Sequence, residues 1–151
     1  MITTTHAWAR RHFFLPVLVF PLAFLLWSGC DTSKSKVYRV GILSGTDAFL
    51  DIAAGFKARM AELGYIEGKN VIYDLQRMNA DPAGELRIAR KFVDDKVDLI
   101  FTFPTEPAVA VKAATQDTNI PVVFAFAGIE GFPLVKSIRE PGGNMTGVRF
   151  P

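Results

Sequence analysis

The sequence contains no histidine after position 12, and Cys30 is its only cysteine. Both histidines, His6 and His12, lie in an N-terminal leader, so the rest of the chain has no imidazole group. Histidine-based triads, cysteine–histidine nucleophiles, disulfides and nearly all zinc sites are therefore excluded there. Catalysis by carboxylates or lysine stays open, but a set of side chains without histidine favours a binding protein. No metal ion or cofactor is expected.

Excess positive charge is also absent outside the leader. The formal charge of +2 comes from Arg10 and Arg11, because no acidic residue precedes Asp31 and the remaining charges balance. Domains that bind nucleic acid carry clustered basic residues, so no nucleic-acid partner is expected. The segment at 64–69, G-Y-I-E-G-K, is one residue short of a phosphate-binding P-loop.

No apolar run is long enough to cross a bilayer. The longest covers Phe13–Trp27, about 15 residues, whereas a spanning helix needs roughly 20. A positive start followed by a short apolar run predicts a signal peptide over residues 1–29. The small residues before Cys30 resemble a bacterial lipobox, which would make Cys30 the lipidated N-terminus. The alternative is an ordinary secretory cleavage site beside an incidental cysteine.

Residues 30–36 are interpreted as the lipidated cysteine and a polar tether, and residues 37–151 as one folded lobe. Strands and helices alternate in this lobe with short connections, which predicts an α/β fold with a doubly wound parallel sheet. The flavodoxin-like strand order 2-1-3-4-5 is expected, because the second strand has a wetter face that suits a sheet edge. Strands are predicted at 37–43, 71–78, 97–103, 122–127 and 145–150, with helices at 49–63, 82–96, 105–114 and, in a short form, 132–139.

The stretch Val97–Ala110 organises the functional prediction. Its apolar run predicts a strand buried on both faces, and Pro104 ends that run. Thr105 and Glu106 lie where the next helix is predicted to begin. Open α/β sheets hold ligands outside the carboxyl ends of their strands, against the free N–H groups of helix starts. A ligand site is therefore expected at this edge of the sheet.

Four segments at 55–71, 98–105, 120–124 and 137–148 carry a family resemblance. They read G-F-K-A-R-M-A-E-L-G-Y-I-E-G-K-N-V, D-L-I-F-T-F-P-T, I-P-V-V-F and S-I-R-E-P-G-G-N-M-T-G-V. Together they resemble the substrate-binding lipoproteins of ABC transporters of the tryptophan/tyrosine type. The resemblance implies a type I periplasmic-binding-protein fold with two α/β lobes hinged around a cleft. It also implies that this chain is a truncated first lobe, without the second.

The resemblance implies ligand contacts from the loops after the first, third and fourth strands. Carried over to this sequence, the ligand-binding residues are Ser44, Thr46, Thr105, Phe126 and Gly128. Other roles stay open at this point. The three hydroxyl groups can instead satisfy or cap the backbone, and Phe126 can serve as core or as a stacking surface.

The sequence thus predicts an exported, lipid-anchored solute-binding protein of an ABC importer. It would lie in the cell envelope, on the periplasmic face of the membrane, anchored through Cys30. Its partners would be a small organic solute, with an aromatic amino acid as the implied class, and the permease subunits. Two alternatives remain: a membrane-tethered flavodoxin-like enzyme that uses carboxylates, and a ligand sensor for a signalling partner.

Overall fold

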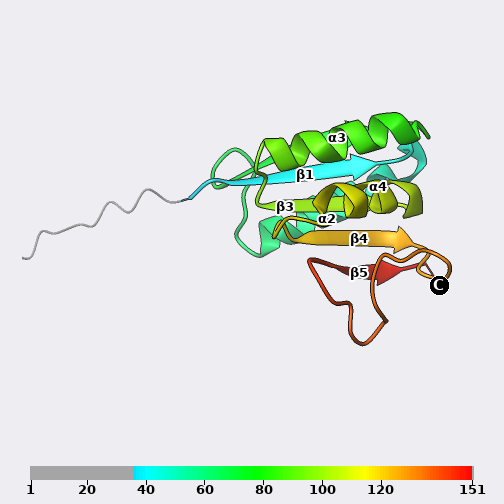
Figure 1. Cartoon of the computed structure of the whole chain (residues 1–151). Helices are drawn as coiled ribbons and strands as arrows, with labels where there is room; N and C mark the ends of the chain where they lie inside the picture. The colour runs from blue at the N-terminus through cyan, green and yellow to red at the C-terminus, as the bar shows by residue number, and fades with distance from the viewer. Residues whose placement is uncertain (1–35, 151) are drawn as a thin grey trace, which may run out of the picture. The chain divides into compact units, whose positions relative to one another are not determined.

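Five parallel strands form the centre of the fold in a computed structural model that describes residues 36–150 (Figure 1). The predicted signal peptide and Cys30 lie outside the described residues. The strands are β1 (Tyr38–Ser44), β2 (Val71–Arg77), β3 (Leu99–Phe103), β4 (Val122–Ala127) and β5 (Met145–Arg149). The helices are the 3-10 helix η2 (Asp47–Phe49) and the α-helices α2 (Leu50–Glu62), α3 (Pro82–Asp94) and α4 (Thr105–Thr115).

The strand order is β2-β1-β3-β4-β5, with every neighbouring pair parallel. This confirms the predicted 2-1-3-4-5 order and the edge position of the second strand. The arrowheads of β1, β4 and β5 point the same way in Figure 1, so the carboxyl ends of these strands meet at one edge. We call it the carboxyl edge.

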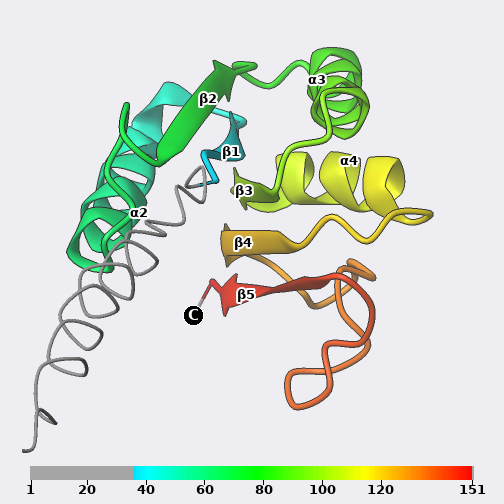
Figure 2. The same ribbon diagram turned by 90° about the vertical axis from the view of Figure 1, so that its left-hand side faces the viewer.

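Both faces of the sheet are covered, as a doubly wound fold requires. Side chains alternate between the two faces along a strand, so neighbours such as Ile42 and Leu43 join different cores. One core packs α2 against β1 and β3, and the other packs α3 and α4 against the opposite face. Figure 2 shows α2 on one side of the sheet and α3 with α4 on the other.

The helix starts follow their local sequence. Thr46 is the N-cap of η2, and Pro82 stands at the start of α3, where a missing N–H costs nothing. Pro104 ends β3 as predicted, and the bond between Phe103 and Pro104 is cis.

The short helix predicted at 132–139 is wrong. Residues 128–144 contain turns and bends instead, and they join β4 to β5. The backbone bonds there are local, from Leu134 N to Phe132 O and from Lys136 N to Pro141 O. Pro133 has no N–H to give to a helix, and only Leu134 is fully buried, so the segment has no apolar stripe that would hold a helix against the core.

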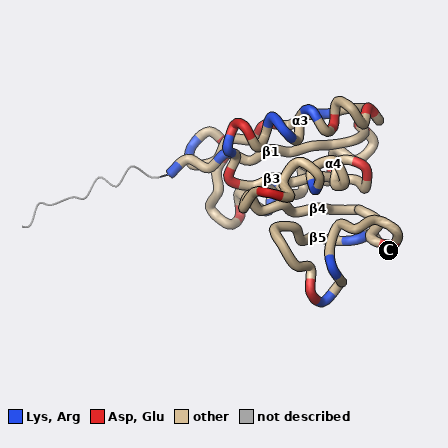
Figure 3. The backbone as a smooth tube through the Cα atoms, in the orientation of Figure 1, with Lys and Arg blue, Asp and Glu red and all other residues tan. Residues whose placement is uncertain are grey.

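Charges of both signs are interspersed on the surface. Figure 3 shows Lys and Arg next to Asp and Glu along α3. At the amino ends of the strands, Asp98 is paired with Lys36 and accepts a hydrogen bond of 2.8 Å from the Arg39 N–H. Within residues 36–150, no helix combines the length and apolar character that a membrane span needs.

Candidate functional site

The carboxyl edge is assembled by backbone hydrogen bonds between loops. Ser44, the last residue of β1, is in register with Phe103, the last residue of β3. The Gly45 N–H donates to the Phe103 carbonyl at 3.0 Å, and the Gly45 carbonyl accepts from Ala80 N–H at 2.8 Å. These bonds fix the loop after β1 between the end of β3 and the loop that leads into α3.

The hydroxyl groups of Ser44 and Thr46 satisfy the backbone of this loop. Ser44 is fully buried, and its Oγ donates to the Thr46 carbonyl at 2.7 Å. Thr46 is partly exposed, and its Oγ1 accepts from the Ala48 N–H at 3.3 Å, which caps η2. Ser44 therefore lies at the predicted site but is not accessible to a ligand. Thr46 lies at the same site and is partly accessible.

Thr105 and Gly128 are directly bonded. The Gly128 N–H donates to Thr105 Oγ1 at 2.9 Å, which ties the loop after β4 to the start of α4. Thr105 is the first residue of α4 rather than its cap, so the capping role considered from the sequence is wrong. The N-cap position is Pro104, which offers no side-chain hydrogen bond, so α4 begins without a side-chain cap. Its first-turn N–H groups remain at the carboxyl edge.

Phe126 has an unusual backbone conformation. Its φ is 56°, in the left-handed region, and it coincides with a shift of register between β4 and β5 at Ala125/Ala127. The Phe126 ring is half-buried and packs between Phe49, at 4.8 Å between centroids, and Phe150, at 4.7 Å. An aromatic cluster thus borders the edge beside Gly128.

Glu85 is a candidate site residue that the sequence did not lead us to predict. It lies in the first turn of α3 and is 1 % exposed, and its Oε1 has no hydrogen-bond partner among the described residues. Burial, followed by the nearby carboxylates of Glu106 and Asp81, raises the pKa of the Glu85 carboxyl group. A signal was present in the sequence, because Glu85 continues the buried stripe of Ala89 and Phe92 at helical spacing.

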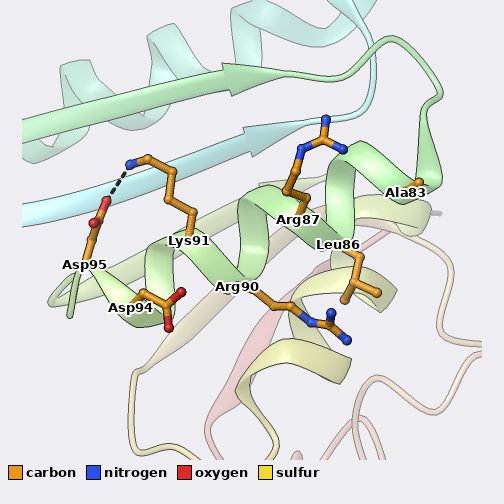
Figure 4. A pocket seen from close by; sticks show the side chains of 7 residues that line it. All are labelled: Ala83, Leu86, Arg87, Arg90, Lys91, Asp94 and Asp95. Carbon is orange, nitrogen blue, oxygen red and sulfur yellow. Dashed lines mark hydrogen bonds and ion pairs between the residues drawn. The ribbon is translucent and has the colours of Figure 1, made fainter.

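Two surface hollows include none of the residues that were predicted to bind the ligand. The larger, of about 590 Å³, runs along the outer side of α3, where Figure 4 shows Arg87 and Arg90 directed away from the Lys91–Asp95 ion pair. Most of its lining residues are exposed, so it is open surface rather than an enclosed pocket. The smaller hollow lies at the amino ends of the strands, near Tyr38 and Asp98. Within residues 36–150, no group of three His, Cys, Asp or Glu side chains could hold a metal ion.

Comparison with known proteins gives a family for most of the chain. Residues 39–149 match the family described as ABC transporter substrate binding protein. The tyrosine-binding protein of Clostridioides difficile is 34% identical over 117 residues, which are 78% of this chain and 34% of that protein.

Solved structures agree with this match. The ligand-free, open structure of a substrate-binding protein with adhesive properties from Clostridium difficile superposes with a TM-score of 0.68 and 32% identity, over 74% of this chain and 38% of that one. An ABC domain in complex with L-Trp from Streptococcus pneumonia gives a TM-score of 0.69 and 30% identity, over 76% and 39%. The chain therefore spans little more than a third of the length of these relatives.

Proposed function

The chain belongs to the family of ABC transporter substrate-binding proteins, and on this premise we propose that it forms one lobe of a receptor for an amino acid. Its fold is that of a lobe of the type I periplasmic binding proteins. The ligand is held at the carboxyl edge and enclosed when a second lobe closes over it. An aromatic amino acid is the proposed ligand class, which is supported by the names of the tyrosine-binding and L-Trp-bound relatives.

One observation carries this proposal. The loops after β1, β3 and β4 are bonded to one another at the carboxyl edge, through Gly45 N–H to Phe103 and Gly128 N–H to Thr105. The start of α4 has no side-chain cap there, and its free N–H groups and positive dipole end favour a carboxylate. The half-buried ring of Phe126 offers an apolar surface beside them.

The proposed contacts are divided by chemistry. Backbone N–H groups at the start of α4, with the hydroxyls of Thr46 and Thr105, bind the carboxylate of the ligand. Phe126 packs against its side chain, Gly128 lets the ligand approach the backbone, and Ser44 supports the loop that carries Thr46.

We propose further that the full receptor is exported, anchored through Cys30 and docked on permease subunits. Labelling cells with radioactive palmitate tests the anchor. The wild-type protein should be labelled and a Cys30→Ala variant should not, whereas an unlabelled wild type refutes the anchor.

An NMR titration of this chain with L-tyrosine and L-tryptophan tests the binding function. We expect saturable shifts of the amide signals of Thr46, Glu106 and Gly128, with no shifts at the amino ends of the strands, for example at Asp98. Shifts confined to other surfaces would refute the site. Product formation from either amino acid in the same samples would favour the carboxylate enzyme instead.

A further inference from the structure

Glu85 lies directly against two parts of the proposed site. A methyl group placed on Gly45 would lie 2.7 Å from Pro107 Cγ and 3.2 Å from Glu85 Oε1. Gly45 stands between Ser44 and Thr46, and Pro107 belongs to the first turn of α4. The carboxyl group of Glu85 is therefore packed beneath the loop and the helix start to which we assign the ligand carboxylate.

The surroundings of Glu85 favour its uncharged form. The charged groups that influence it are both acidic: Glu106 belongs to the first turn of α4, and Asp81 is the N-cap residue that precedes α3. From the loop after β1 comes Asp47, which is paired with Arg77 of β2 at 3.3 Å. An ionised Glu85 would be a buried negative charge beside two like charges, and its Oε1 has no donor among residues 36–150.

We propose that Glu85 is a positioning residue that makes ligand binding at the carboxyl edge depend on pH. While Glu85 is uncharged, it does not oppose the attraction between the N–H groups at the start of α4 and the carboxylate of the ligand. When Glu85 ionises, a negative charge appears one side chain away from that carboxylate and repels it. Affinity is therefore highest at low pH and falls as the pH rises through the pKa of Glu85. The inference rests on the proposed function.

The test compares the pH dependence of binding in two variants of the whole chain. NMR titrations with L-tyrosine between pH 5 and pH 8, on wild type and Glu85→Gln, give Kd values in which the titration of the ligand itself is common to both. We expect the wild-type Kd to rise about tenfold, which corresponds to roughly 1.4 kcal/mol. The Kd of Glu85→Gln should stay within about twofold. A Glu62→Gln variant removes an exposed acid at the end of α2 and should follow the wild type.

A second measurement needs no variant. Linkage requires that a ligand which binds better to uncharged Glu85 also raises the pKa of that group. A tenfold change in affinity corresponds to an upward shift of about one unit. NMR of the Glu85 side-chain carboxyl carbon in the wild-type chain, with and without saturating L-tyrosine, measures this shift.

The outcomes separate the two proposals. If wild type and Glu85→Gln bind with the same pH profile, or if L-tyrosine leaves the Glu85 pKa unchanged, this inference is overturned. An affinity that increases with pH also overturns it, because the ligand would then present its ammonium group to Glu85. If neither L-tyrosine nor L-tryptophan gives saturable shifts at any pH, the proposed function itself fails, and the inference fails with it.

Discussion

The hydroxyl groups of Ser44 and Thr105 at the carboxyl edge differ in whether they can still donate a hydrogen bond to a ligand. Ser44 Oγ both donates to the Thr46 carbonyl and accepts from the Thr46 N–H at 3.4 Å, so its hydrogen is used inside the loop. Thr105 Oγ1 accepts from Gly128, and among residues 36–150 its own O–H donates to nothing. A hydroxyl has one hydrogen to donate, so Thr105, unlike Ser44, can still donate to a ligand carboxylate.

Replacing Thr105 by valine tests this difference. The variant keeps the shape of the side chain but leaves the Gly128 N–H without its acceptor, which should cost about 1–2 kcal/mol of unfolding free energy. Binding of L-tyrosine should weaken as well. Thr118→Val is the matched control, because Thr118 makes comparable bonds to Thr115 and Ile120 at the far end of α4. It should lose stability without losing affinity, and equal losses of affinity in both variants would argue against a ligand contact.

The buried acid predicts a pH dependence of stability that needs no ligand. The pKa of Glu85 is raised in the folded chain by burial, Glu106 and Asp81, so folding favours the protonated form. The resulting stability is fully present below the unfolded pKa of about 4.3 and is lost as the pH rises through the folded value. Glu85→Gln should therefore match the wild type near pH 4.

At pH 8 the same variant should be more stable than the wild type by about 1 kcal/mol or more, because only the wild type then carries a charge that is buried without a partner. Urea unfolding of both proteins across this pH range measures the difference. A difference between them that stays constant with pH would show that Glu85 does not titrate in this way.

At the scale of elements, α4 and the loop after β1 approach so closely that only glycine fits between them. A methyl group on Gly45 would lie 2.7 Å from Pro107 Cγ, so Gly45→Ala must displace the start of α4 or the loop. We expect a loss of about 1–3 kcal/mol by chemical denaturation, as for other overpacked sites.

Gly55→Ala is the control for that substitution. Gly55 lies in the middle of α2 with no atom within 4 Å of an added methyl group, so the change should stabilise the helix by about 0.5–1 kcal/mol. Opposite signs for the two glycines are expected. A stabilising effect at Gly45 would mean that the contact with Pro107 is loose.

Most elements of the fold could be predicted because their patterns are local. The β4 bounds were predicted without error, and the carboxyl edge followed from the rule that parallel strands end together. The helix predicted at 132–139 is wrong because a local pattern does not tell how many of its residues the core will bury. Of these eight residues, only Leu134 is buried. A local pattern predicts a helix or strand correctly where its apolar residues are buried in the core. The connection between β4 and β5 buries too few of them and forms turns instead.

The details of the site could not be predicted, for a different reason. The bond from Gly128 to Thr105 joins residues 23 positions apart, and no spacing rule selects that pair. The left-handed φ of Phe126 arises where β4 and β5 shift register, which a sequence of apolar residues does not reveal. Glu85 was visible as an acid in an apolar stripe, but its role depends on how closely α3 lies to Gly45.

At the scale of the whole molecule, the proposed function requires two lobes to close around a ligand, and this chain is proposed to form one of them. Because only part of the contacts comes from the carboxyl edge, we expect this chain alone to bind L-tyrosine weakly, with a Kd of about 1 mM. A chimera in which it replaces the matching third of the Clostridioides difficile tyrosine-binding protein should bind at least about 100-fold more tightly, a gain of roughly 2.7 kcal/mol. Calorimetry measures both affinities, and the chimera carrying Thr105→Val should lose part of the gain. Sub-micromolar binding by the chain alone would contradict the two-lobe mechanism, because the carboxyl edge would then hold the ligand without a partner lobe.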